Sequence, residues 1–215
     1  MNRTQSGKNH YDDFYSKGGW KYYNWREKRF LVKRIISPLK LQRGLKLLEL
    51  GCGMGFHSHL FSKLGFEVVG VDLSEAGISY AKNHFFEPQF LNIDATILSS
   101  EFEYEHFDVI FVRGMSWYHY ELNGVNIHGV NVPSRTQELF RFLTKNGIFI
   151  LQIKTDFSGR RPDNEVHHNK LEDYIRLFSS FGEVVFISDL KGKILRNQED
   201  AEKLKKDIII ATRKA

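Results

Sequence analysis

From Leu45 onward, short apolar runs alternate with segments in which apolar residues recur every three or four positions. Short apolar runs are typical of buried strands, and the three-to-four spacing is typical of helices that cover a sheet. This alternation indicates an α/β fold, a three-layer sandwich with helices on both faces of a mainly parallel sheet. The pattern predicts strands at 46–50, 67–72, 88–92, 107–112, 147–154, 183–189 and 207–213, and helices at 56–64, 74–84, 134–144 and 168–181.

The connection between the last two predicted strands differs from the others. Residues 191–206, KGKILRNQEDAEKLKK, are polar and basic and contain no convincing apolar helix. Neighbouring strands that are joined without a crossover run antiparallel. We therefore expect a seven-stranded sheet whose last strand is reversed.

Residues 1–44 are interpreted as an N-terminal aromatic and basic helical extension of a single domain, residues 45–215. A helix is expected from about Lys21 to Leu39, ending near Ser37 and Pro38. Aromatic residues crowd the segment before it and could form a lid hinged at Gly18 and Gly19; the alternative is packing on the sheet edge. The aromatic residues between positions 8 and 25 are Tyr11, Phe14, Tyr15, Trp20, Tyr22, Tyr23 and Trp25.

The charge distribution and the cysteine content indicate the kind of partner and the cellular compartment. The net charge of +5 is uneven: residues 1–46 carry 12 Lys and Arg against 3 Asp and Glu, a net of +9, whereas the remainder carries 19 against 23, a net of −4. The basic segment could attract an anionic partner, or it could be a solvated helix face. There is no membrane-length apolar run and no signal-peptide core, and Cys52 is the only cysteine, so we expect a cytoplasmic protein without disulfides.

The stretch LLELGCGMGFHSHLF, from Leu47 to Phe61, joins a predicted strand to a predicted helix through Gly51, Gly53 and Gly55. Such a junction presents unpaired backbone N–H groups at the positive end of the helix dipole. Glycine also allows a ligand to approach the backbone closely. One glycine would suit a plain turn, and three indicate a ligand-binding loop.

Acidic residues follow the next two predicted strands. Asp72 ends the strand in EVVGVDLS, 17 residues beyond Gly55, where a carboxylate can accept both hydroxyls of a ribose. Its alternative role, capping the next helix, can be filled by Ser74. Asp94, in PQFLNIDAT, could meet the edge of a purine or make a local turn. The glycines do not fit G-x-G-x-x-G, which argues against a dinucleotide, and the phosphate-loop motif is absent.

The segments ELGCGMG, GVDLS, NIDA and FDVIFVRG resemble, in order and spacing, the motifs of the class I S-adenosylmethionine-dependent methyltransferases. The resemblance covers about residues 45–155 and implies a Rossmann-like fold with a reversed seventh strand. It implies that S-adenosylmethionine is the cofactor, with Asp72 at the ribose, Asp94 at the adenine amino group and Arg113 near the sulfonium. The methionine part would lie among Glu49, Gly51, Gly53 and Gly55. The full set of expected cofactor-binding residues also includes Cys52, Leu73, Ala95, Tyr11, Tyr15 and Trp20.

Several acceptor classes lack their motifs. The segment RGMSWYHY does not match the Asn/Asp-Pro-Pro-aromatic motif of enzymes that methylate amino groups. Methylation at carbon 5 of pyrimidines needs a cysteine nucleophile, and Cys52 is wrongly placed for it because it lies inside the glycine loop. Arg113 replaces an acidic ligand needed for metal-assisted catechol methylation, although Asp156 is available, and no metal is expected. A small-molecule acceptor with a hydroxyl, amine or carboxylate remains, bound near Trp117, Tyr118, His119 and Tyr120.

His119 is the candidate general base, because histidine titrates near pH ~6.5; alternatively it caps or packs. Other histidines, His128, His167 and His168, are weak candidates for a metal site. Arg160 and Arg161 could hold an anionic acceptor or belong to a solvated loop.

Two other functions stay open. A pI of 9.2 and the basic N-terminal segment suggest an RNA methyltransferase, although no RNA-binding motif accompanies them. The second is a non-catalytic partner subunit that binds the cofactor, since an intact glycine loop indicates cofactor binding but does not establish catalysis. The sequence predicts no membrane partner.

Overall fold

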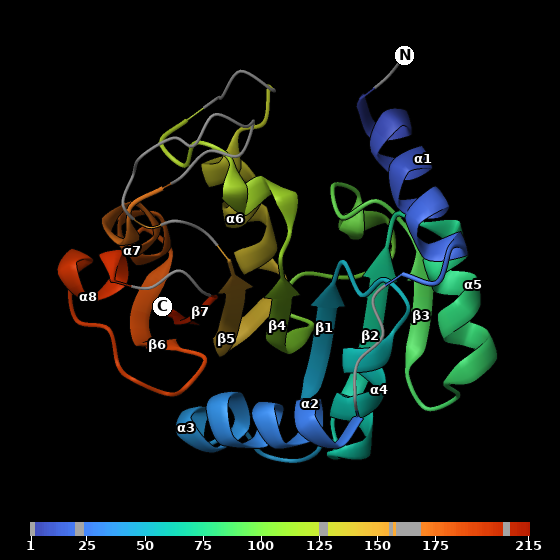
Figure 1. Cartoon of the computed structure of the whole chain (residues 1–215), viewed down its shortest axis with the longest axis horizontal. Coiled ribbons are helices and arrows are strands. Elements are labelled where there is room, and N and C mark those ends of the chain that lie inside the picture. The colour runs from blue at the N-terminus through green and yellow to red at the C-terminus, as the bar shows by residue number, and fades with distance from the viewer. Residues whose placement is uncertain (1–2, 20–23, 125–128, 155–156, 158–168, 204–206) are drawn as a thin grey trace. The chain divides into compact units, whose positions relative to one another are not determined.

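The computed structural model describes residues 3–19, 24–124, 129–154, 157, 169–203 and 207–215 (Figure 1). It contains strands β1 (Lys46–Leu50), β2 (Glu67–Asp72), β3 (Gln89–Asn92), β4 (Phe107–Arg113), β5 (Leu143–Ile153), β6 (Gly182–Asp189) and β7 (Ile208–Lys214). They form one sheet in the order β3-β2-β1-β4-β5-β7-β6. The α/β fold class predicted from the sequence is confirmed.

The direction of the strands also agrees with the prediction. β1 pairs with β2, β2 with β3, and β4 with β5, each in parallel. β7 runs antiparallel to both β5 and β6, so the last strand is reversed. Short helix α8 (Gln198–Glu202) lies between β6 and β7 and was not predicted, because it has one buried residue, Ala201.

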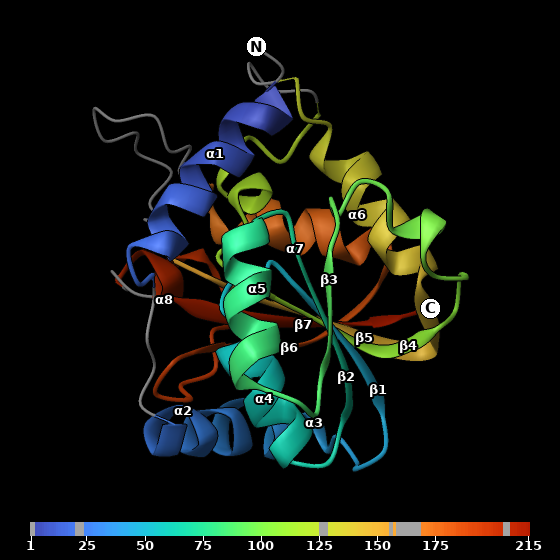
Figure 2. The same cartoon turned by 90° about the vertical axis from the view of Figure 1, so that its right-hand side faces the viewer.

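The chain divides into two compact units, Met1–Glu103 and Tyr104–Ala215. In the first unit, α4 (Phe56–Lys63) and α5 (Glu75–His84) pack on β2 and β3, and Figure 2 shows them on one side of these strands. Leu47, Leu48 and Leu50 of β1 are all buried, as expected for a strand covered on both faces. The unit also contains α1 (Arg3–Ser16), α2 (Asn24–Leu31), η1 (Val32–Ile36), α3 (Ser37–Leu39) and η2 (Leu98–Ser100).

Several helix boundaries differ from the prediction, and two of the differences have clear local reasons. The predicted helix near 21–39 is, in its described part, a sequence of α2, η1 and α3, and it continues past Pro38. Pro38 stands in the first turn of α3, where no N–H donor is required, and the chain leaves the helix at Lys40 with φ 53°. In the second unit, α6 (Val132–Arg141) begins two residues early because Asn131 caps it by accepting a hydrogen bond from Ser134 N.

The second unit also contains η3 (Ser116–His119) and α7 (Leu171–Ser179). β5 starts at Leu143, earlier than predicted, and its pairing with β4 shifts between Phe107 and Val109. Asn146 has φ 63° within this irregular stretch. The residues TKNG include no apolar residue that would predict a strand. Among the described residues, none of the helices has the length and apolarity required to cross a bilayer.

Candidate cofactor-binding site

The glycine loop, Gly51–Gly55, joins the carboxyl end of β1 to the start of α4. The N–H groups of Gly51 and Cys52 both donate to the Val71 carbonyl, at 2.9 and 3.0 Å, which fixes the loop to the end of β2. The residue before α4 is glycine, Gly55, because a Cβ there would lie 2.7 Å from the Phe90 ring and 2.8 Å from Ala81 Cβ. One of the three glycines is thus required by packing rather than by a ligand.

Gly53 is required for a different reason. Its backbone has φ +52°, a conformation that side chains other than glycine rarely adopt, and a Cβ there would lie 2.5 Å from the Tyr15 hydroxyl oxygen. Gly77 of α5 also approaches the loop, because a Cβ at Gly77 would lie 2.9 Å from the Gly53 carbonyl oxygen. Gly77 could not be identified as a loop contact from the sequence, because it lies inside a predicted helix. Loop, α5 and Tyr15 therefore meet at Gly53.

Asp72 lies at the end of β2 with its carboxylate turned toward the loop. Gly53 N and Ser74 N each donate to one of its oxygens at 2.8 Å. Burial raises the pKa of Asp72 above its ordinary value, the nearby charge of Asp12 adds to this, and the two backbone hydrogen bonds oppose it. Each carboxylate oxygen keeps a further acceptor direction, so the group can still receive ligand hydroxyls. Ser74 caps α5 by accepting from Gly77 N, as expected.

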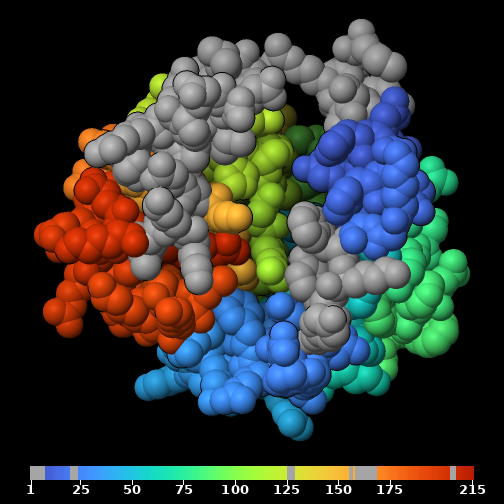
Figure 3. Space-filling model, in the orientation of Figure 1, coloured from blue at the N-terminus to red at the C-terminus, as the bar shows by residue number. Residues whose placement is uncertain are grey.

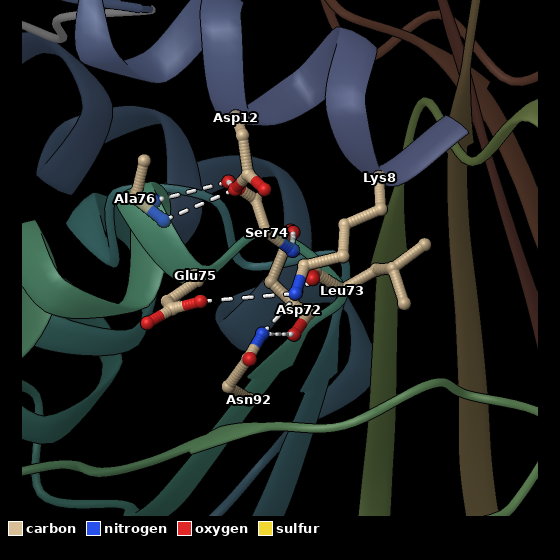
Figure 4. Close-up of polar contacts among 9 residues, drawn as sticks. Lys8, Asp12, Asp72, Leu73, Ser74, Glu75, Ala76 and Asn92 are labelled. Carbon is tan, nitrogen blue, oxygen red and sulfur yellow. Dashed lines mark hydrogen bonds and ion pairs between the residues drawn. The ribbon is translucent and has the colours of Figure 1, made fainter. Parts of the chain in front are cut away.

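Helix α1 lies against the start of α5, a position that the sequence did not reveal. The Asp12 carboxylate accepts hydrogen bonds from Ser74 Oγ at 2.6 Å and from Ala76 N at 3.1 Å, and Lys8 lies 3.7 Å from Glu75 (Figure 4). These are favourable contacts for an anionic group at a helix N-terminus. The surfaces of α1 and α5 adjoin in the space-filling view (Figure 3).

The packing of α1 against α5 sets the positions of Tyr15 and Tyr11. The Tyr15 ring touches the loop at Gly53, and Tyr11 stacks on Tyr15 with ring centroids 6.3 Å apart. Gly18 and Gly19 come directly after α1 and have positive φ values of 105° and 44°. The expected lid residues Tyr11 and Tyr15 therefore lie on a helix beside the loop, and Trp20 lies outside the described residues.

The segment after β3 lies next to the end of β2. Asn92 Nδ2 donates to the carbonyls of Asp72 and Leu73, at 3.0 and 2.9 Å, and thereby holds the turn that carries Asp72. Asp94 accepts a hydrogen bond from Thr96 N at 2.8 Å, so its side chain makes a local turn. Ala95 is half-buried in that turn. Asn92 was missed, although its place at the carboxyl end of a parallel strand was a usable signal.

Glu49 at the end of β1 and Cys52 within the loop are both buried. Glu49 accepts a hydrogen bond from Ser58 Oγ of α4. Burial, together with the charges of Glu49 and Asp72, raises the pKa of the Cys52 thiol well above its ordinary value. A thiol kept protonated is a poor nucleophile, consistent with excluding Cys52 from the chemistry.

The remaining candidates belong to the second unit. Arg113 is the last residue of β4, half-buried, and His119 is the last residue of η3. Side chains from other elements donate hydrogen bonds to backbone carbonyls at the end of η3. The Tyr174 hydroxyl donates to the Tyr118 carbonyl at 2.5 Å, and Asn169 Nδ2 donates to the Tyr120 carbonyl at 2.7 Å. The candidates that lie outside the described residues are His128, Asp156, Arg160, Arg161, His167 and His168.

Strand order, the reversed β7 and a glycine loop beside an acidic residue at the end of β2 define the class I S-adenosylmethionine-dependent methyltransferase fold. A model of the methyltransferase domain family matches residues 41–206, and the chain belongs to that family.

Known proteins resemble the chain in sequence and in fold. Ubiquinone biosynthesis O-methyltransferase of Pelagibacter ubique is 32% identical over 132 residues, which cover 57% of this chain and 50% of that protein. The chain thus spans about half the length of this curated relative. A TehB-like methyltransferase from Corynebacterium glutamicum superposes with TM-score 0.62 at 18% identity, covering 99% of this chain and 98% of that one. The PH0226 protein from Pyrococcus horikoshii has TM-score 0.66 at 20% identity, covering 91% and 93%.

Proposed function

We propose that the chain is an S-adenosylmethionine-dependent methyltransferase that acts on a small molecule bearing a hydroxyl, amine or carboxylate. The observation that carries this proposal is the buried Asp72 carboxylate, which is bonded to Gly53 N at the shared end of β1 and β2. The O-methyltransferase name of the sequence relative favours oxygen as the acceptor atom.

The described residues fit the cofactor in three places. Gly53 has no side chain, and a Cβ at this position would collide with the Tyr15 hydroxyl; the methionine part would approach the backbone here. Asp72 supplies acceptors for the ribose hydroxyls, and Asp94 and Ala95 would border the adenine. Cys52 and Leu73 would contribute backbone, and Arg113 is proposed to lie near the sulfonium. When bound, the cofactor supplies an electrophilic methyl group on a good leaving group.

The chain's own contribution to the chemistry would be mainly positioning. Holding two reactants in line is worth effective molarities of ~10⁵ M or more. η3 is suited to this because the bonds from Tyr174 and Asn169 fix its backbone. Burial raises the pKa of Tyr174, so its hydroxyl stays protonated and keeps donating. His119 would take the proton of a hydroxyl acceptor.

Replacing Asp72 with alanine should weaken binding of S-adenosylhomocysteine by about 2–4 kcal/mol, since a charge-assisted contact to the ribose is lost. Because the pKa of Asp72 is raised, affinity of the parent should fall on acidification at a higher pH than an ordinary aspartate would require, as the carboxylate takes up a proton. This fall should be absent in Asp72→Ala. Calorimetric titration at several pH values measures both effects, and unchanged affinity in the variant would refute the proposed site.

We also propose that α1 is a lid over this site, latched by Asp12. Asp12→Ala removes two hydrogen bonds to α5, worth about 1 kcal/mol, and should raise amide exchange of residues 8–18 roughly fivefold without cofactor. S-adenosylhomocysteine should restore protection in both the parent and the variant. Asp13→Ala is the matched control, because Asp13 pairs only locally with Lys17 on the exposed side of α1. Equal protection with and without ligand in the parent would mean that the aromatic rings are plain packing.

RNA methylation is a second candidate, favoured by the exposed basic side chains of α2, Arg26, Lys28 and Arg29. Phosphate contacts weaken steeply with salt, so filter binding of RNA at increasing salt would separate the two candidates. Flat, weak binding at all salt concentrations would favour a small-molecule acceptor.

A further inference from the structure

A histidine lies between two carboxylates beneath the glycine loop. His57 Nε2 lies 3.2 Å from Glu27 Oε2 of α2, and His57 Nδ1 lies 3.8 Å from Glu49 Oε1 of β1. The second distance is that of an ion pair rather than a hydrogen bond. The other oxygen of Glu49 accepts from Ser58, the residue after His57. The first turn of α4 therefore engages both oxygens of Glu49.

The three side chains of this arrangement are largely buried, so their charges must be compensated by one another. The side chains of His57 and Glu49 are 6% and 3% exposed, and that of Glu27 is 21% exposed. A buried carboxylate is expensive unless partners compensate its charge, and removing one partner leaves the other uncompensated. A protonated imidazole donates from both ring nitrogens, so one His57 ring can serve both carboxylates.

We propose that His57, held by Glu27, is a positioning residue that fixes the Glu49 carboxylate for the ammonium group of the cofactor's methionine part. This inference rests on the proposed function, which places the methionine part at Glu49 and the glycine loop. It extends the binding site to α2, whose Glu27 has no place in the family motifs of the loop. His57 acts through Glu49 and does not itself touch the cofactor.

The inference predicts a loss confined to the methionine part of the ligand. His57→Gln should weaken S-adenosylhomocysteine binding about tenfold, the size of coupling typical of residues in one charged network. It should leave unchanged the affinity for 5′-methylthioadenosine, which has the same nucleoside but no amino-acid group. A general loosening of the loop would weaken both ligands equally. Titration calorimetry with the two ligands separates the two effects.

Glu27→Gln should show the same selective loss, and the double variant should lose no more than the larger single loss, because both substitutions break one bridge. Glu27 is the most exposed member, so this variant keeps the test available even if His57→Gln does not fold. His59→Gln is the matched control: it lies on the same helix and pairs with Glu87 at 3.3 Å instead. It should bind both ligands like the parent.

Three results would count against the inference. Parent-like affinity of His57→Gln and Glu27→Gln for S-adenosylhomocysteine would refute it while leaving the proposed function intact. Equal losses for both ligands would reduce His57 to a structural role. A parent protein that binds neither ligand would overturn the proposed function and this inference together.

Discussion

Valine at position 53 is expected to abolish binding of S-adenosylhomocysteine. A Cβ at Gly53 would lie 2.5 Å from the Tyr15 hydroxyl oxygen and 2.8 Å from the ring carbon that bears it. Tyr15 is the far end of a side chain and can move aside, so the protein can accommodate the new residue. The proposed ligand should not be accommodated, because the valine methyl groups and the Tyr15 ring that they displace would compete with it for the space beside the loop.

Backbone strain is a competing explanation, since Gly53 has φ +52° and a β-branched residue is strongly disfavoured there. Gly44→Val separates the two effects. Gly44 has φ +82°, but nothing lies within 4 Å of a Cβ built on it. Both variants should lose roughly 1–2 kcal/mol of stability from the backbone, a difference visible in thermal unfolding. Only Gly53→Val should lose the ligand in calorimetry; parent-like affinity there would remove the loop from the site.

The strands were predictable because their signal is local. β1 and β2 have the predicted boundaries, since KLLEL and EVVGVD are apolar runs that end at glycine or a polar turn. The reversed β7 was predictable from what its connection lacks, a crossover helix. The first residues of β5 were not, because LTKN contains few apolar residues and takes its strand conformation from pairing with β4.

The candidate site was predictable in its motifs and much less so in its supports. Gly53 and Asp72 could be paired from the sequence because they follow neighbouring strands, and they do form a hydrogen bond. Asp12 could not, because its partners Ser74 and Ala76 lie more than sixty positions away and α1 is predominantly polar. Gly55 was interpreted as part of a ligand loop, whereas its packing against Phe90 is sufficient reason for glycine.

If the acceptor is a hydroxyl, His119→Gln is expected to lower turnover by roughly 10²–10⁴-fold, the usual contribution of a positioned general base. Glutamine keeps much of the size and hydrogen bonding of histidine but has no basic nitrogen. The affinity for S-adenosylhomocysteine should stay nearly unchanged, because His119 ends η3 and is not assigned to the cofactor.

The experiment first needs an acceptor, which a metabolite library screened by release of S-adenosylhomocysteine would supply. His84→Gln is the control, since His84 is exposed at the end of α5 and contacts the Tyr80 carbonyl. If the acceptor proves to be a carboxylate, no proton has to leave, and the same substitution should act on acceptor KM rather than on kcat. Parent-like kcat and KM in His119→Gln with a hydroxyl acceptor would refute His119 as the general base, because glutamine has no basic nitrogen.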